Sequence, residues 1–315
     1  MSPKNIGFID LVAFGAFRSL RVLFRLLPRR ACLALGGALG RSWFRISRTH
    51  RRLALANLEI AFGHEFSALE RRRIGRDSFS YFVRAAADNL KWTYLRDERR
   101  AKLLAVEGKE HILGALGQGR GALLFSAHFG NWEVAALAVA RLGKLNVVAR
   151  ALDNPLVESE LARFRNSLGA RIISKFQAAR PILQALHRNE IVAILIDQNV
   201  LRSQAVFVDF FGREAATTPA LASFYLRTRS PLIPLFCYPT PSSEYLVKIG
   251  KPLSPELSGD LERDVLKITQ ACTKMIEAEI RANPSLWFWF HNRWKTRPEN
   301  QSAGPPGPAA GLSEA

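Results

Sequence analysis

Downstream of Glu107 the chain alternates short apolar runs with helix-like stretches, and this alternation constrains the fold more than any other feature. The apolar runs have the length and composition of strands buried on both faces. They are Ala122–Ala127, Leu145–Ala149, Ile191–Ile196 and Leu232–Cys237. Helical patterns lie between and after them, at Asn131–Leu142, Pro155–Leu168, Pro181–Arg188, Pro219–Arg229 and Asp260–Ala282. We therefore expect an α/β fold with a mainly parallel central sheet flanked by helices.

The first third of the chain has a different pattern. From Arg41 to Lys102 it is rich in Arg, Leu and Ala with amphipathic helical spacing, and the chain ends in a Pro/Gly/Ala-rich tail. The expected organisation is a basic helical membrane-associating region at 1–102, an α/β domain at 103–297 and a disordered tail at 298–315.

Positive charge is concentrated in this first third. The whole chain carries a net charge of +18, and residues 1–102 account for +13 of it. Such a field favours an anionic partner, and charge alone leaves nucleic acid, an anionic lipid surface and an acidic protein open.

The stretch Ile6–Leu27 has the pattern of an amphipathic helix. Arg18, Arg21 and Arg25 recur at helical spacing with apolar residues opposite them, and the longest uncharged run, Leu11–Phe17, is too short to span a bilayer. A helix lying in a membrane interface fits this pattern. An ordinary surface helix that covers the core fits it as well.

Several site types lack the sequence signals they require. The three cysteines lie far apart, which excludes a disulfide scaffold and indicates a reducing compartment. No HExxH or Cys/His cluster suggests a metal, and no GxSxG elbow suggests a hydrolase of that type. The glycines of Gly117–Gly121 precede a strand instead of following one, so they predict no nucleotide-binding loop. We expect no metal and no cofactor.

The sequence from Ser126 to Glu133, SAHFGNWE, is the strongest candidate for chemistry. His128 falls in the turn after a predicted strand, Asn131 can cap the next helix, and Glu133 falls in its first turn. Glu133 can then fold back to the imidazole, hold one tautomer and make His128 a general base. Gly130 keeps the turn open to substrate. A His and an acid at this spacing are, without that context, more often structural than catalytic.

Polar residues also end two other predicted strands. His128, Arg150 and Asp197 each follow one, and ligands of parallel α/β sheets bind beyond the carboxyl ends of the strands. A cap or a surface ion pair is the alternative for each of them singly. Together they predict a site at one edge of the sheet.

An aromatic and basic segment, Trp287–Lys295, lies near the end of the chain. Three interpretations remain open: nucleobase stacking, contact with a membrane interface or an acyl chain, and a segment docked on the core by its aromatic side chains.

These motifs occur together and in one order: HFGNWE, VVARALDNP, VDFFG followed by an A-x-T, and WFWFHNRWKTRP. The sequence resembles the lipid A late acyltransferases, the lauroyl and myristoyl transferases within the lysophospholipid acyltransferase superfamily. The resemblance covers roughly residues 5–298. It implies transfer of a fatty acyl chain from acyl carrier protein to a hydroxyl of a lipid A precursor, a Kdo-bearing tetraacyl lipid A, at the cytoplasmic face of a bacterial inner membrane.

The resemblance also implies roles for particular residues. His128 becomes the general base and Glu133 its orienting partner. Arg165 would hold a substrate phosphate or the developing oxyanion, and backbone N–H groups near Gly130–Trp132 are the other oxyanion donors expected. The remaining residues that we expect to contact substrate are Gly130, Asn131, Arg150, Asn154 and Asp197, with Asp209–Gly212 in a neighbouring loop.

Three alternatives to this function stay open at this point. Related enzymes acylate other glycolipids, such as phosphatidylinositol mannosides, or lysophospholipids, with acyl-CoA or acyl carrier protein as donor. The high charge and the aromatic segment suggest a nucleic-acid-binding protein. A lipid-binding protein without catalysis would keep the fold, but not the intact His–Glu pattern. We expect a glycolipid, an anionic membrane surface and acyl carrier protein as partners, and no nucleic acid.

Overall fold

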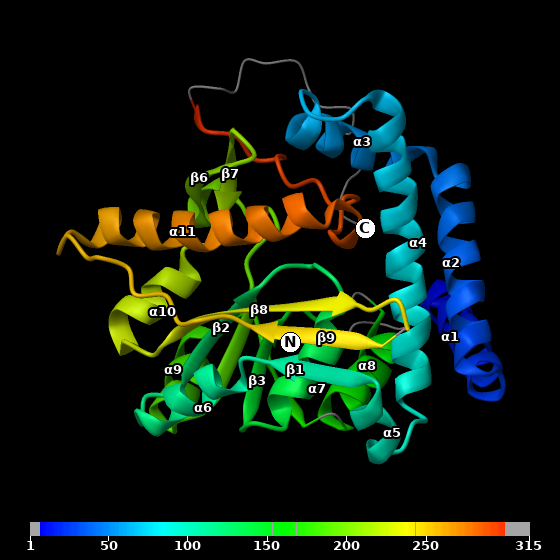
Figure 1. Cartoon of the computed structure of the whole chain (residues 1–315), viewed down its shortest axis with the longest axis horizontal. Helices are drawn as coiled ribbons and strands as arrows, with labels where there is room; N and C mark the ends of the chain where they lie inside the picture. The colour runs from blue at the N-terminus through cyan, green and yellow to red at the C-terminus, as the bar shows by residue number, and fades with distance from the viewer. Residues whose placement is uncertain (1–6, 153, 168, 243, 300–315) are drawn as a thin grey trace.

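A computed structural model describes residues 7–152, 154–167, 169–242 and 244–299 of the 315-residue chain. Most of the predicted tail, from residue 300 on, lies outside the described residues, as do residues 1–6 of the basic region. The fold is α/β with a central sheet, as expected (Figure 1).

The central sheet has seven strands, and most neighbouring pairs are parallel. Among the described strands of this sheet, β8 and β9 form the one antiparallel pair. Its spatial order is β1 (Leu104–Glu107), β9 (Tyr245–Ile249), β8 (Leu232–Pro239), β2 (Ala122–Ser126), β5 (Ile191–Leu195), β3 (Leu145–Ala149) and β4 (Ala170–Ser174). A separate hairpin joins β6 (Val206–Phe210) to β7 (Arg213–Thr217). The predicted mainly parallel sheet is confirmed.

Two layers of helices cover the sheet, and alternate residues of β2 face them. Leu123 and Phe125 pack into the cluster that contains residues of α9 (Ala179–His187), α10 (Ala220–Thr228) and α11 (Leu261–Ala282). Ala122 and Leu124 pack on the other side with α6 (Lys109–Gly117) and α7 (Trp132–Ala140). In Figure 1, α11 crosses one face of the sheet, with α6 and α7 beyond the other. Because both faces are covered, the central strands are apolar throughout.

The N-terminal helices stand against one end of the sheet (Figure 1). They are α1 (Phe8–Leu26), α2 (Arg29–Ile46), α3 (Arg48–Phe62), α4 (Ala68–Trp92) and α5 (Asp97–Lys102). A Cβ on Gly40 of α2 would lie 2.3 Å from the carbonyl oxygen of Phe79, so glycine lets α2 pack closely along α4. Residues of α2, α3 and α4 share a core cluster with β2 and β5. The division at 102/103 stays a prediction.

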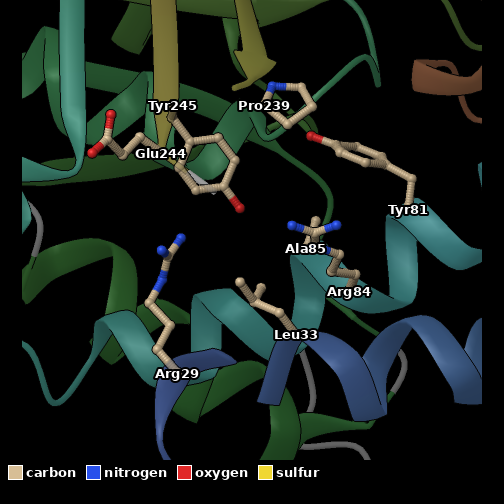
Figure 2. A pocket seen from close by; sticks show the side chains of 8 residues that line it. All are labelled: Arg29, Leu33, Tyr81, Arg84, Ala85, Pro239, Glu244 and Tyr245. Carbon is tan, nitrogen blue, oxygen red and sulfur yellow. The ribbon is translucent and has the colours of Figure 1, made fainter. Parts of the chain in front are cut away.

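A buried polar cluster joins α2, α4 and β9. Arg29 donates two hydrogen bonds to Asp88, at 2.7 and 2.6 Å, and the hydroxyl of Tyr245 donates to the same carboxylate at 2.8 Å. Figure 2 shows the hollow beside this cluster, with Tyr81 and Arg84 on the side opposite Arg29. The hollow has a volume of about 10 Å³. That volume suits about one water molecule and excludes an organic ligand.

The helix α1 is anchored through one side only. Phe24 is buried against Cys32 and Ala87, with Leu20 and Leu27 packed beside them. Leu20 and Leu27 belong to the apolar side expected opposite the arginines, and they face the protein, as in a helix that covers the core. Among the described residues, no helix combines the length and the apolar character needed to cross a bilayer.

Candidate active site

The sheet register brings His128 and Asp197 together. Neighbouring strands β2 and β5 are parallel, and Ser126 of β2 pairs with Leu195 of β5. His128 and Asp197 each follow two residues after these partners, so they meet beyond the carboxyl edge of the sheet. Strand pairing therefore joins residues that are far apart in the sequence.

The Asp197 carboxylate accepts three hydrogen bonds. Oδ1 lies 2.8 Å from Nδ1 of His128, and Oδ2 accepts the backbone N–H of His128 at 2.9 Å. Oδ2 also accepts the indole N–H of Trp287 at 2.8 Å. The Asp197 side chain is only 2% exposed, so these three donors replace water around its charge.

The charge on Asp197 is stabilised despite its burial. Burial alone would raise the pKa of the carboxyl group, but the interactions with His128 and Trp287 lower it to about 2. Asp197 is thus ionised at neutral pH and can only accept hydrogen bonds, which places the proton of the neutral imidazole on Nδ1. The lone pair of the ring is then on Nε2.

The Nε2 side of His128 is partly open. The side chain is 21% exposed, and its ring packs edge-on against Trp132 at a centroid distance of 5.0 Å. The side-chain nitrogen of Gln198 lies 3.3 Å from Nε2. A substrate hydroxyl that displaced the Gln198 amide would meet an unprotonated imidazole nitrogen, which is the geometry of a general base.

Glu133 pairs with Arg165, so the predicted contact between Glu133 and His128 is wrong. Oε1 of Glu133 lies 2.6 Å from Nη2 of Arg165, and both carboxylate oxygens lie 3.1 Å from its Nε. In the described part of the chain, the hydrogen-bond partner of His128 Nδ1 is Asp197 instead. Glu133 lies in the first turn of α7, and Arg165 is on α8 (Pro155–Ser167). The pair is nearly buried, with side chains 10% and 13% exposed.

Gly130 and Asn131 shape the turn after β2. Gly130 has a φ of +60°, and a Cβ there would lie 1.6 Å from the carbonyl oxygen of Cys237, so only glycine fits. Its N–H donates to the carbonyl of Leu286 at 2.8 Å and so is not an oxyanion donor, contrary to one expectation. The side chain of Asn131 accepts from Val134 as the cap of α7, as predicted, and also donates to Asn89.

The other predicted contact residues lie at different places. Arg150 is exposed just after β3. Asn154 caps α8 through its side-chain oxygen and donates to the carbonyl of Asp10 at 3.0 Å, which ties α8 to α1. Asp209 and Gly212 belong to the β6–β7 hairpin, where Asp209 pairs with Lys274 of α11 at 2.6 Å. Contact of these residues with substrate stays a prediction.

The C-terminal aromatic segment is part of the core. Trp287, Trp289 and Trp294 are at most 4% exposed, which rules out their stacking on nucleobases or lying in a membrane interface. Buried Arg293 holds the hairpin through the carbonyl of Ala216 at 2.5 Å, and burial lowers its pKa to about 10. Of the three interpretations, docking on the core is the one confirmed.

A carboxylate-oriented histidine at the carboxyl edge of a mainly parallel sheet defines the class: an α/β enzyme site equipped to deprotonate a substrate hydroxyl. The particular family follows from comparison with known proteins. Residues 11–296 match the family of bacterial lipid A biosynthesis acyltransferases. The chain belongs to this family and is an O-acyltransferase, as the sequence motifs predicted.

Individual relatives agree with this assignment. A lipid A biosynthesis lauroyltransferase of Escherichia coli K12 is 29% identical over 87% of this chain and 88% of its own length. A lipid A biosynthesis palmitoleoyltransferase of the same strain is 26% identical over 88% and 89%. A phosphatidylinositol mannoside acyltransferase of Mycolicibacterium smegmatis is 27% identical over 70% and 71%.

Proposed function

We propose that the chain transfers a fatty acyl chain from an acyl carrier protein thioester to a hydroxyl of a lipid A precursor, the Kdo-bearing tetraacyl lipid A. The observation that carries the proposal is the His128–Asp197 pair, with the Nε2 side of the ring open and Nδ1 held at 2.8 Å. Membership of the lipid A acyltransferase family supports a glycolipid acceptor. A thioester is already activated, so a base and positioning groups suffice for the transfer.

In the proposed reaction, His128 Nε2 takes the proton of the acceptor hydroxyl as its oxygen attacks the thioester carbonyl. Asp197 stabilises the imidazolium that forms, because its charge lies 2.8 Å from Nδ1. When the tetrahedral intermediate collapses, the C–S bond breaks and His128 returns the proton to the departing sulfur. The products are an ester on the lipid and a free thiol on the carrier.

Glu133 and Arg165 have a positioning role in this proposal. The bidentate geometry fixes the guanidinium plane of Arg165 beside the turn that carries His128. A fixed cation of this kind suits a substrate phosphate or the oxyanion of the intermediate. Glu133 therefore acts by aiming Arg165, and Asp197 takes the orienting role that the sequence had suggested for Glu133.

A second acceptor class deserves a direct test, because one relative is named as a phosphatidylinositol mannoside acyltransferase. The alternative function is acylation of another membrane glycolipid or a lysophospholipid, with acyl-CoA or acyl carrier protein as donor. The chemistry at His128 is the same for each.

The experiment is a panel of acceptors and donors read by mass spectrometry. Detergent-solubilised protein is incubated with Kdo-bearing tetraacyl lipid A, a phosphatidylinositol mannoside or a lysophospholipid, each with acyl carrier protein or CoA thioesters of several chain lengths. We expect the lipid A precursor to gain one acyl group with the carrier-protein donor, and His128→Gln protein to give none. A gain only on another lipid, or only with CoA, would replace the proposed acceptor or donor.

We also propose that α1 attaches the protein to an anionic lipid surface at the cytoplasmic face of the inner membrane. Four apolar residues spaced along one stripe of the helix are exposed: Phe8, Val12, Val22 and Leu26. Arg18 and Arg25 flank this stripe and suit anionic headgroups. The buried side of α1 is held by the protein, so the exposed stripe remains available to lipid.

The double variant Val12→Asp/Leu26→Asp should weaken binding to vesicles that contain anionic lipid by about tenfold or more, since each buried aliphatic side chain contributes about 1.5–3 kcal/mol. Co-sedimentation with phosphatidylglycerol vesicles measures this. Leu261→Asp is the matched control, because Leu261 is also exposed but begins α11 at the far end of the molecule (Figure 1). Equal binding by all three proteins would contradict the proposed attachment.

A further inference from the structure

The side chain of Trp287 reaches the candidate site from the far end of the chain. Its indole N–H donates to Asp197 Oδ2 at 2.8 Å, and both residues are buried. This bond contributes to the low pKa of Asp197. It is a hydrogen bond to an ionised acceptor inside the protein, where such bonds are strong.

The backbone around Trp287 also contacts the turn that carries His128 and Gly130. Phe288 N–H donates to the carbonyl of His128 at 3.1 Å, and the carbonyl of Leu286 accepts from Gly130 at 2.8 Å. The carbonyl of Trp287 accepts the hydroxyl of Ser78 on α4 at 2.7 Å. The segment 286–288 is therefore fixed to both the turn and α4, and the indole is held in place by more than its own packing.

Two neighbouring tryptophans show that this contact is specific to Trp287. The indole N–H of Trp289 donates to the carbonyl of Pro284 at 2.6 Å. The indole nitrogen of Trp294 is buried and has no hydrogen-bond partner among the described residues. All three rings are buried, so replacing each of them removes similar aromatic packing, but only Trp287 loses a bond to Asp197.

We propose that Trp287 is a positioning residue whose indole N–H holds Asp197 and thereby sets the basicity of His128 in acyl transfer. The proposal rests on the proposed function, in which His128 is the general base. Without the indole donor, less of the negative charge on Asp197 is neutralised by hydrogen bonds. The remaining charge then attracts the imidazolium of His128 more strongly, while the carboxylate, without the indole donor, holds the ring less rigidly.

Other titratable and charged groups also lie near His128 and Asp197. His291 faces Asp197 and His128 from the C-terminal segment, and burial lowers its pKa to about 4, so it is neutral near pH 7. Arg293, from the same segment, is a buried cation that interacts with Asp197. From α7, Glu133 is paired with Arg165.

The loss of the indole donor should change the pH dependence of the reaction in one direction. A general base must be unprotonated in the free enzyme, so the acidic limb of kcat/KM against pH reports His128. Removal of the indole donor leaves more uncompensated negative charge beside the ring, which favours the protonated imidazole and moves this limb to higher pH. In Trp287→Phe we expect an upward movement of about 0.5–1 pH unit and a fall in kcat of about tenfold, with KM little changed.

The pH profiles of Trp287→Phe, Trp294→Phe and the unaltered protein test this, with circular dichroism to verify folding. We expect Trp294→Phe to keep the acidic limb where it is. If both variants move the limb equally, or if Trp287→Phe lowers activity without moving it, the indole has a packing role only and the proposal is overturned.

A second measurement is independent of both activity and the Trp287 variant. Protein labelled with ¹⁵N at the indole nitrogen has six tryptophans and therefore six indole resonances. Asp197→Asn removes the charged acceptor, so one resonance should move upfield by much more than the other five. If no resonance moves, the bond is absent and the proposal fails. If one moves but the unaltered protein acylates no lipid in the panel, the proposed function fails while the contact stands.

Discussion

Replacement of His128 by glutamine is expected to lower kcat by about 10³-fold, because it removes the only imidazole that Asp197 orients toward the open side of the site in the described structure. Glutamine cannot accept a proton at neutral pH, and its size limits the cavity that the substitution leaves. Acyl transfer measured at saturating donor tests this directly.

The control for this result is substrate binding. Since His128 contributes mainly when the proton moves, the variant should bind a non-hydrolysable donor analogue within about threefold of the unaltered protein. Retention of more than a tenth of the original kcat in a folded His128→Gln protein would contradict the assignment of His128 as the base.

The second large effect is expected for Asp197→Asn. An amide at this position can donate to Nδ1, which favours the tautomer with the proton on Nε2 and so removes the basic lone pair from the open side. In a serine protease the equivalent change costs about 10⁴-fold in kcat, and we expect a loss of about 10³-fold here. Asp264→Asn is the matched control, because Asp264 is also a buried carboxylate but binds Ser258 and Gly259 at the start of α11.

Glu133→Gln separates the two carboxylates that could orient His128. It breaks the pair with Arg165 and should lower activity through the position of that guanidinium. The ¹⁵N resonances of the His128 ring should nevertheless report the same tautomer as in the unaltered protein. A tautomer changed by Glu133→Gln and left intact by Asp197→Asn would restore the His–Glu pair suggested by the sequence.

The fold could be predicted from the sequence mainly where strands are buried on both faces. β2, β5 and β8 are nearly continuous apolar runs, and all three were identified. β1, β4 and β9 were not, because exposed residues interrupt the apolar pattern in each of them. β1 and β4 are also the edges of the sheet. An apolar run marks a central strand, and an edge strand lacks that signal.

The sequence identified the residues of the candidate site better than it identified the contacts between them. His128, Glu133, Arg165 and Asp197 were each named, but the partners were exchanged. The placement of His128 in a turn and Glu133 in the first turn of the next helix suggested that the two meet. The partner of His128 is instead set by the β2–β5 register, which the pattern along one chain does not supply. The link from Trp287 to Asp197 joins positions 90 residues apart and has no local sequence signal.

The most direct test of the account is the mass of the acceptor lipid after incubation with an acyl donor, with unaltered and Asp197→Asn proteins compared side by side. We predict that the unaltered protein adds one acyl group, that mild alkali releases it as expected for an ester, and that Asp197→Asn protein adds almost none in the same time. Equal acylation by the two proteins would contradict the central claim that Asp197 orients His128 as the base of an O-acyltransferase.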